Sequence, residues 1–329
     1  MAGIFVLGSN SFAGSVFIDS ALSEGHRVWG INRSAEPAAA FLPCKSNPRV
    51  SAYRFRRLDI NNDLPAICAW MSETRPDYVV DFAGQGMVAE SWQDPAQWYQ
   101  TNIVSKVRIH DFLRRQDWLR MYIRISTPEV YGSTSSLIRE DQPYHPSTPY
   151  AVSHAATDMS LTAFFNNYRF PVVLTRFANF FGPGQQLYRI VPRAILCALT
   201  GRKLPLHGGG TSIRAFIHGR DVASGVLATM ARGESGETYH FSPDRFVSIR
   251  ELVELICRKL GVNFEGAVEV TVDRPGKDQA YLMDASKARS ELGWRPTISL
   301  EEGLDQTVAW VRANLELLKT LNWDYAHKP

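Results

Sequence analysis

The sequence has few cysteines, no long hydrophobic run and no marked excess of charge of either sign. No stretch approaches the ~20 uninterrupted apolar residues that a bilayer helix needs, so no membrane span is expected. The four cysteines are scattered and form no CxxC pair, which argues against a disulfide framework and against a zinc site. The N-terminal residues lack the basic start and the long apolar core of a signal peptide. These absences predict a reduced, cytoplasmic protein.

The charge balance gives no reason to expect a nucleic-acid partner. Lysine and arginine total 36 and aspartate and glutamate total 33, a formal charge of +3. No basic stripe with interleaved aromatic residues stands out, and the arginine-rich stretch at 53–57 is the best candidate for an anion contact. His207 and the other histidines form no ligand cluster, so no metal is expected.

Short apolar runs alternate with helical stretches along the first half of the chain. The run IFVLG begins at Ile4, and later runs lie at 26–32, 77–83, 121–127 and 171–179. They do not alternate with polar residues, which is typical of strands buried on both faces of a parallel sheet. Helical stretches separate them, notably 95–115 and 150–168. This order predicts a doubly wound parallel sheet of the Rossmann type, an α/β fold.

The pattern loosens after about residue 180. We expect residues 1–179 to form the dinucleotide-binding domain, with a return segment at about 215–242. Residues 180–214 and 243–329 are expected to form a smaller, interleaved α/β C-terminal lobe that binds the substrate.

A glycine turn joins the first strand to the first helix. Gly8, Ser11 and Gly14 stand there, with Phe12 in the same turn. Such a turn allows close backbone approach to a pyrophosphate at a helix N-terminus. Ser11 occupies a position where glycine is usual, and serine tolerates left-handed backbone angles poorly. A plain strand–helix turn is the alternative interpretation.

The second strand ends without the acidic residue that usually holds the adenosine ribose. Its tip reads Asn32-Arg33-Ser34. An arginine there suits the 2′-phosphate of NADP, so NADP is favoured, with NAD as the alternative. Arg33 could also be a solvated loop residue.

Several segments in family order resemble the extended short-chain dehydrogenase/reductases, and among them the nucleotide-sugar dehydratases and epimerases. They cover nearly the whole chain and include GSNSFAG (8–14), FAGQGMVAES (82–91), STPEVYG (126–132), PYAVSHAA (149–156) and RFANFFGPGQQ (176–186). The mixture looks closest to the GDP-mannose 4,6-dehydratase branch, with dTDP-glucose 4,6-dehydratases next.

The resemblance implies a redox pair of tyrosine and lysine four residues apart, on one helix face. Tyr150 matches the tyrosine, which takes the sugar O4 proton. The fourth residue on is His154 rather than lysine. A neutral imidazole would supply no fixed positive charge, whereas an imidazolium would.

The resemblance also implies roles for the segment Thr127-Pro128-Glu129. Thr127 resembles the hydroxyl that bonds the sugar O4 and the tyrosine, and Glu129 resembles the base that removes the C5 proton. Pro128 has no proton to give, so Glu129 or a bound water must also serve as the acid. An ordinary strand-end carboxylate is the alternative for Glu129.

The remaining site residues follow from the same resemblance. Asp59 and Ile60 look like the pair that positions adenine, and further cofactor contacts are implied at Ala83, Gln85 and Asn102. Substrate contacts are implied at Asn179, Val191, Arg193, Arg214 and Arg274.

The resulting hypothesis is an NADP-dependent 4,6-dehydratase that acts on a nucleotide-diphosphate sugar. A homodimer through a four-helix interface is expected, with a tetramer as the alternative. A 4-epimerase, a decarboxylase or a 4-keto reductase on the same fold stays open. So does a catalytically weakened nucleotide-binding protein, because Ser11, Pro128 and His154 all depart from the family pattern.

Overall fold

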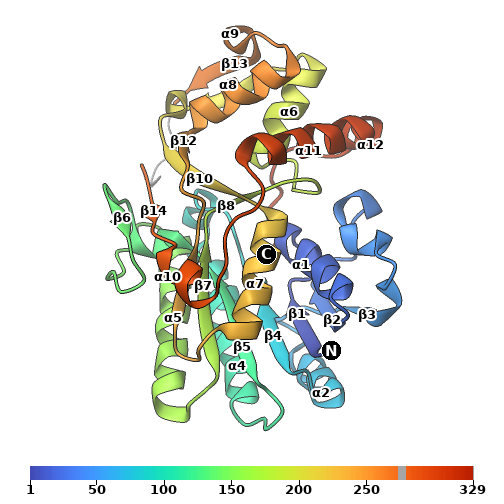
Figure 1. The fold of residues 1–329 in the computed structure, drawn as a ribbon, viewed down its shortest axis with the longest axis vertical. Helices are drawn as coiled ribbons and strands as arrows, with labels where there is room; N and C mark the ends of the chain where they lie inside the picture. The colour runs from blue at the N-terminus through green and yellow to red at the C-terminus, as the bar shows by residue number, and fades with distance from the viewer. Residues whose placement is uncertain (273–278, 329) are drawn as a thin grey trace.

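A seven-stranded parallel sheet forms the larger part of the molecule (Figure 1). The structure is a computed structural model that describes residues 1–272 and 279–328. The strand order is β11-β7-β5-β4-β1-β2-β3. The strands are β1 (Gly3–Leu7), β2 (Arg27–Asn32), β3 (Tyr53–Arg57), β4 (Tyr78–Asp81), β5 (Met121–Ser126), β7 (Val172–Phe177) and β11 (Thr238–Phe241). The doubly wound sheet is therefore confirmed.

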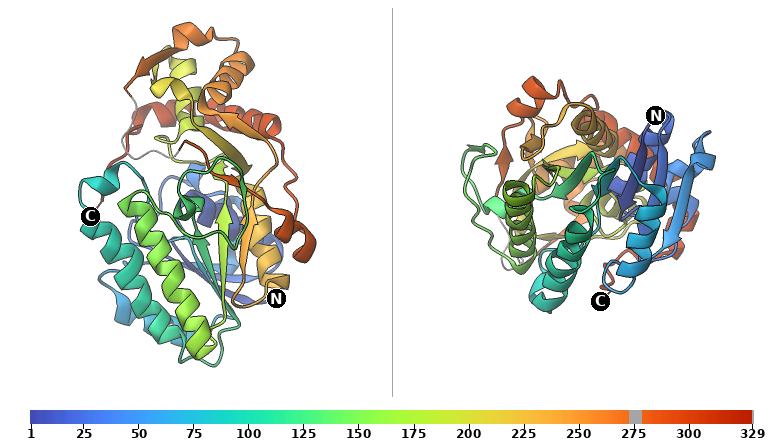
Figure 2. Two further views of the ribbon diagram at one scale, coloured as in Figure 1. Left: turned by 90° about the vertical axis from the view of Figure 1, so that its left-hand side faces the viewer. Right: turned by 90° about the horizontal axis from the view of Figure 1, so that it is seen from below.

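Helices cover both faces of the sheet, as the view from below shows (Figure 2, right). Along β1, Ile4 and Val6 belong to the core beneath α1 (Phe12–Ser23) and α7 (Gly219–Arg232). Phe5 and Leu7 belong to the core on the opposite face. That face carries α2 (Leu64–Thr74), α4 (Ser105–Leu113) and α5 (Pro149–Tyr168). The continuous apolar run of β1 is thus explained by burial on both sides.

The helix expected at 95–115 is interrupted by a π-helical segment. It consists of α3 (Pro95–Tyr99), the π-helical turn Gln100–Val104 and α4. Asn102 lies within that turn and its side chain is fully buried. Such π-helical turns are rare and concentrate at functional sites.

The C-terminal lobe has its own apolar core, formed mainly by α6, α8 and α11. A three-stranded sheet, β12-β10-β8, and the pair β13-β9 complete it. The strands are β8 (Asn179–Phe181), β9 (Leu204–His207), β10 (Ile213–His218), β12 (Phe246–Ser248) and β13 (Val268–Thr271). The helices are α6 (Ile190–Thr200), α8 (Ile249–Leu260), α9 (Phe264–Ala267), α11 (Leu300–Ala313) and α12 (Leu315–Thr320). No helix in the described part of the chain is long and apolar enough to span a membrane.

Two parts of the segment 243–329, which the sequence assigned wholly to the lobe, return to the sheet domain. The strand β14 (Leu282–Met283) pairs with β6 (Leu137–Ile138), and α10 (Ser286–Glu291) packs near β11. The last residues also reach the sheet domain. Neither return was visible in the sequence, because neither segment shows an amphipathic pattern of its own.

Asp221 on α7 fastens the connection between α10 and α11 to the sheet domain. Its carboxylate accepts hydrogen bonds from Thr297 N at 2.9 Å, Thr297 Oγ1 at 2.8 Å and Ile298 N at 3.1 Å. The residue is 1% exposed. A buried carboxylate with three donors is stabilising, because its lost hydration is replaced.

The substitution Asp221→Asn should lower the free energy of unfolding by about 2 kcal/mol, since hydrogen bonds to a charged group are worth about 1.5–3 kcal/mol. The asparagine amide would also point its NH₂ group, which is a donor, at groups that are themselves donors. Denaturant titration measures the change. Asp305→Asn, at an exposed ion pair with Lys259, should change the free energy by less than about 1 kcal/mol. Equal effects of the two variants would contradict the role given to Asp221.

Candidate active site

A cavity of about 320 Å³ lies where the strands β1, β2, β3 and β4 end. Open α/β sheets bind ligands at this edge. One wall comes from the loops that follow these strands, namely Gly8, Asn10, Ser11, Ile31, Asn32, Arg33, Ser34, Leu58, Asp59, Ile60, Asn61, Phe82, Ala83, Gly84 and Gln85. The opposite wall comes from Gln186, Tyr188, Tyr325, Ala326 and Lys328. Most residues expected to bind the cofactor therefore share one cavity.

The glycine turn has the close packing that a phosphate-binding turn needs. Gly8 has a φ of +79°, and a Cβ there would lie 2.7 Å from Ala83 N. A Cβ on Gly14 would lie 2.5 Å from Gly8 O. Phe12 is 4% exposed in the core, so it offers the turn only its backbone.

Ser11 stands where glycine is usual, yet its backbone is not left-handed. Its φ is −68° and its ψ is 157°, in the extended region. Its hydroxyl accepts a hydrogen bond from Gly14 N at 3.1 Å, which makes it the N-cap of α1. The concern that serine would be strained here is therefore wrong.

The tip of β2 carries positive charge. Arg33 is half-buried, and its Nη2 lies 3.4 Å from Gln85 Oε1. Arg57 Nε donates to the carbonyl of Arg33 at 3.0 Å, and Lys328 Nζ lies 3.2 Å from Ser34 Oγ. Three basic side chains thus surround this corner of the cavity.

Asp59 and Ile60 both line the cavity. The Asp59 carboxylate is held in its own loop, accepting from Asn61 N at 2.9 Å and from Asn62 Nδ2 at 3.0 Å. These bonds shape the loop at the end of β3, and they leave Ile60 partly in the core under α2.

Asn102 lies behind the cavity and does not line it. Its Oδ1 accepts from Gln85 N at 2.8 Å, and its Nδ2 donates to Gln85 O at 3.1 Å and to Ser153 Oγ at 2.9 Å. Asn102 therefore positions the loop Ala83–Gln85 against α5, so the expected direct cofactor contact is corrected to a positioning role.

Thr127, Pro128 and Glu129 follow directly after β5. Thr127 is the N-cap of a short helix, Pro128–Tyr131, and Pro128 occupies its first position, where an N–H is not needed. Thr127 Oγ1 donates to Glu129 Oε2 at 2.7 Å. Glu129 is thus held as a hydrogen-bond acceptor, the state required of a base.

Tyr150 and His154 lie on one face of α5, with ring centroids 4.6 Å apart. Burial raises the pKa of Tyr150 above its ordinary value, and the Glu129 carboxylate raises it further. The Thr127 hydroxyl and Arg189 act in the opposite direction. Tyr150 is therefore a protonated phenol at neutral pH unless positive charge comes close.

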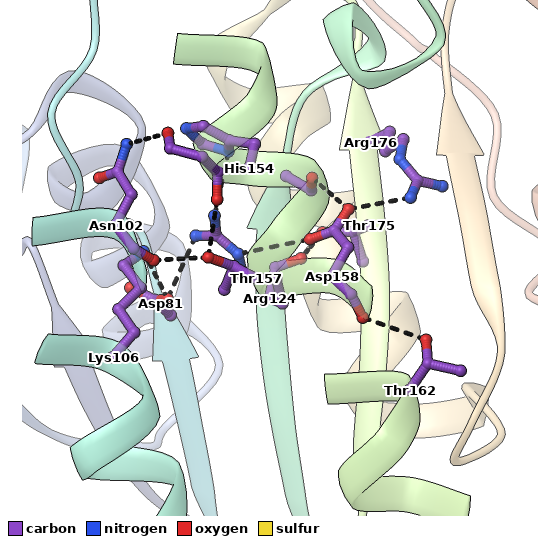
Figure 3. Close-up of polar contacts among 12 residues, drawn as sticks. Asp81, Asn102, Lys106, Arg124, His154, Thr157, Asp158, Thr162, Thr175 and Arg176 are labelled. Carbon is purple, nitrogen blue, oxygen red and sulfur yellow. Dashed lines mark hydrogen bonds and ion pairs between the residues drawn. The ribbon is translucent and has the colours of Figure 1, made fainter. Parts of the chain in front are cut away.

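A buried network of charged side chains lies beneath these residues (Figure 3). Asp81 accepts from Lys106 Nζ at 2.8 Å, and Arg124 Nη1 lies 3.2 Å from the same oxygen. Asp158 accepts from Arg176 Nη2 at 2.9 Å, and Arg124 Nε lies 3.7 Å from it. All five side chains are fully buried. None of these five residues was singled out from the sequence.

The expected substrate residues divide into two groups. Asn179 Oδ1 accepts from Tyr281 Oη at 2.7 Å, and the Arg214 guanidinium stacks 4.2 Å from the Tyr281 ring. Tyr281 also lies near enough to Tyr150 to affect its pKa. The structure thus brings Asn179 and Arg214 together through Tyr281, a residue that sequence reasoning missed.

The other substrate residues are placed differently. Val191 is fully buried in the core of the lobe, so the expected contact with substrate is wrong for this structure. Arg193 is engaged by the end of the chain, donating to Trp323 O at 2.6 Å and pairing with Asp324 at 3.0 Å. Arg274 lies outside the described residues. Arg189, which approaches Gly86, was missed.

The C-terminal residues cross from the lobe to the sheet domain (Figure 2, left). The His327 ring stacks on Trp98 of α3 with centroids 4.9 Å apart. Tyr325 packs against Tyr188, and Gln85 Nε2 donates to Lys328 O at 2.7 Å. This segment closes one side of the cavity, and no periodicity in the sequence points to it.

Residues 5–307 match the family model described as GDP-mannose 4,6 dehydratase. A dTDP-glucose 4,6-dehydratase of Xanthomonas campestris is 33% identical over 334 residues, covering 95% of this chain and 94% of that protein. One of Haemophilus influenzae is 31% identical over 343 residues, covering 95% and 99%.

The solved structures that this chain resembles belong to the same group of enzymes as its sequence relatives. The dTDP-glucose 4,6-dehydratase of Streptomyces venezuelae, with NAD and TYD bound, superimposes with a TM-score of 0.88 at 30% identity over 96% of this chain and 98% of that one. The UDP-glucose 4-epimerase of Thermotoga maritima gives 0.86 at 26% identity, over 95% and 99%. The fold and site define an extended short-chain dehydrogenase/reductase of the nucleotide-sugar dehydratase and epimerase class. Within that class, the chain belongs to the nucleotide-sugar 4,6-dehydratase family, as the resemblance predicted.

The N-cap role of Ser11 can be tested by stability. Ser11→Ala should lower the free energy of unfolding by about 1 kcal/mol, and Ser11→Gly by only a few tenths, because glycine is a tolerable N-cap and alanine is not. Ser11→Thr keeps the hydroxyl and serves as the matched control. If Ser11→Gly instead stabilised the protein, the serine backbone would be strained after all. Chemical denaturation of the three variants decides this.

Proposed function

We propose that this protein is a nucleotide-sugar 4,6-dehydratase, which converts a nucleotide-diphosphate hexose to its 4-keto-6-deoxy form. The observation that carries this proposal is the contact between Thr127 and Glu129 at the end of β5, beside Tyr150. A carboxylate in this position supplies the base for C5, which elimination requires and which simple epimerisation at C4 does not.

The residues present fit a nicotinamide dinucleotide. The glycine turn allows close backbone approach, and the cavity extends from that turn to the tip of β2. Gly8, Ser11, Asn32, Arg33, Ser34, Ile60 and Ala83 would hold the cofactor, with Asn102 fixing the loop behind it. A nicotinamide held there would supply the acceptor for the C4 hydride and the hydride donor for C6.

The proton movements fall to three side chains. Tyr150 takes the proton from O4 during oxidation, and Thr127 stands beside it as a hydroxyl partner. Glu129 then removes the C5 proton, which the neighbouring ketone has made acidic. Because Pro128 has no proton to donate, Glu129 also hands a proton to the hydroxyl that leaves C6 as water. When hydride reaches C6, C5 takes up a proton from solvent, and Tyr150 releases to solvent the proton that it took from O4. The net change is the loss of one water from the sugar.

The family model bears the name of GDP-mannose, whereas the relatives from Xanthomonas and Haemophilus are named for dTDP-glucose. We propose dTDP-glucose as the first substrate to test and GDP-mannose as the second. Arg214 and Arg189 are the described cations beside the substrate half of the site, and they suit a diphosphate.

We further propose that the cofactor is NADP. Arg33, Arg57 and Lys328 surround the end of β2, where the ribose 2′ position of a dinucleotide lies in this fold. We also propose a homodimer through α5 and the helical stretch made of α3, the π-helical turn and α4. Val104 of the turn and Val152 and Met159 of α5 are exposed apolar residues suited to burial.

A panel of sugars in deuterated water tests the dehydratase. The protein is incubated separately with dTDP-glucose, GDP-mannose, CDP-glucose and UDP-N-acetylglucosamine, and products are analysed by mass spectrometry. Loss of one water with gain of one deuterium is expected for one of them. Glu129→Gln should abolish this product while nicotinamide absorbance still reports C4 oxidation, because only the C5 base is lost.

Glu73→Gln, on the exposed part of α2, is the matched control and should leave turnover unchanged. Epimerised product without loss of water would favour a 4-epimerase. No change in any sugar, with cofactor still bound, would overturn the proposed reaction for this panel.

Cofactor preference is tested by binding titrations. Arg33→Ala should weaken NADP binding by about tenfold or more, since a hydrogen bond to a charged group is worth about 1.5–3 kcal/mol. NAD binding should change little, because NAD has no 2′-phosphate. Arg54→Ala, an exposed arginine of β3 that bonds its own loop, is the control. Tighter binding of NAD than of NADP by the unaltered protein would contradict the preference.

A further inference from the structure

His154 has a charged partner on the neighbouring strand. Arg124 of β5 places Nη2 3.0 Å from His154 Nδ1 (Figure 3). A guanidinium carries only donors, so the imidazole must accept at Nδ1 with its lone pair. The proton of the neutral ring is therefore on Nε2. For Nε2 no partner occurs among the described residues, which leaves it free to donate to a ligand.

The surroundings keep His154 in this state. Burial lowers the pKa of His154 well below its ordinary value, and Arg124, Lys106 and Arg176 lower it further. A second proton at Nδ1 would have to displace the Arg124 donor. His154 thus differs from a surface histidine, whose charge changes between about pH 5 and pH 8.

Arg124 is itself held in place as a cation. It pairs with Asp81 at 3.2 Å through Nη1 and lies 3.7 Å from Asp158 through Nε. Asp81 is shared with Lys106, and Asp158 is shared with Arg176. These fully buried pairs contain three cations and two carboxylates, so positive charge is in excess beneath α5.

We propose that Arg124 is a positioning residue that holds His154 as a neutral Nε2–H donor and supplies, from behind the ring, the positive charge absent from position 154. This inference rests on the proposed oxidation at C4, in which Tyr150 must act as a base. The Arg124 charge lies 3.0 Å from the His154 ring, and that ring packs against Tyr150 with centroids 4.6 Å apart. It therefore favours the phenolate through the imidazole, in addition to Arg189, which lowers the pKa of Tyr150. Compared with a lysine at position 154 of α5, the positive charge is carried here by Arg124 of the neighbouring strand β5.

The first test needs no substrate and uses the unaltered protein. Nitrogen-15 NMR of labelled histidines, with His154→Gln to assign the resonance, should show the Nε2-protonated tautomer throughout the range of about pH 5 to pH 8. In Arg124→Gln, the pKa of His154 should rise, while burial still holds it below its ordinary value. Because a glutamine amide can accept as well as donate, the Nδ1-protonated tautomer should also appear beside the Nε2-protonated one. An Nδ1-protonated ring, or titration in the unaltered protein, would overturn the proposal.

The second test moves the positive charge from position 124 to position 154. Arg124→Gln should lower the rate of cofactor reduction by about tenfold, the effect of one pKa unit in Tyr150, with little change in KM for the sugar. His154→Lys alone should also be impaired, because two cations then meet in a buried place. The double variant should recover activity relative to Arg124→Gln, since one cation again stands beside Tyr150.

Arg120→Gln, just before β5 and exposed, is the matched control. A merely structural role for Arg124 predicts that the double variant is worse than either single variant, which would overturn the proposal. If no sugar is turned over, the proposed function fails, yet the tautomer and titration of His154 still decide the role of Arg124. If Arg124→Gln does not fold, the NMR of the unaltered protein decides alone.

Discussion

The carboxylate of Asp81 is the buried charge on which the arrangement of the site depends. It accepts from Lys106, from Tyr122 Oη at 2.8 Å and from Ala83 N at 3.1 Å, and it pairs with Arg124. Burial acts to raise the pKa of Asp81, but Lys106 and Arg124 hold it below its ordinary value. A buried ion is tolerated only when its hydrogen-bonding capacity is filled, and here four groups fill it.

Asp81 thereby joins the two halves of the site. Through Ala83 it fixes the loop that lines the cofactor cavity, and Lys106 also donates to the carbonyl of Ala83. Through Arg124 it fixes His154 on α5. The cofactor wall and the pair of Tyr150 and His154 therefore share one rigid support, as precise positioning of reacting groups requires.

Much of the fold and part of the site could be predicted from the sequence, because local patterns encode them. Apolar runs without alternation give buried parallel strands, and Gly8, Thr127 and Glu129 follow such strands directly. What the sequence did not reveal depends on contacts between distant segments. Arg124 looks like an odd charge in an apolar strand, Arg193 bonds the end of the chain, and Tyr281 joins Asn179 to Arg214. The strand β3 was missed because three of its five residues are arginine, and it lies at the sheet edge.

The three departures from the family pattern also look different once their neighbours are known. Ser11 is a helix N-cap with an extended backbone, and Pro128 occupies the first position of a short helix. His154 has lost the charge of a lysine but lies against a buried guanidinium. Local inconsistency would argue for a weakened homologue, whereas each of these residues is consistent with its surroundings. The departures therefore fit the proposed active enzyme, in which Arg124 carries the charge beside position 154 and Glu129 is proposed to donate the proton that Pro128 cannot.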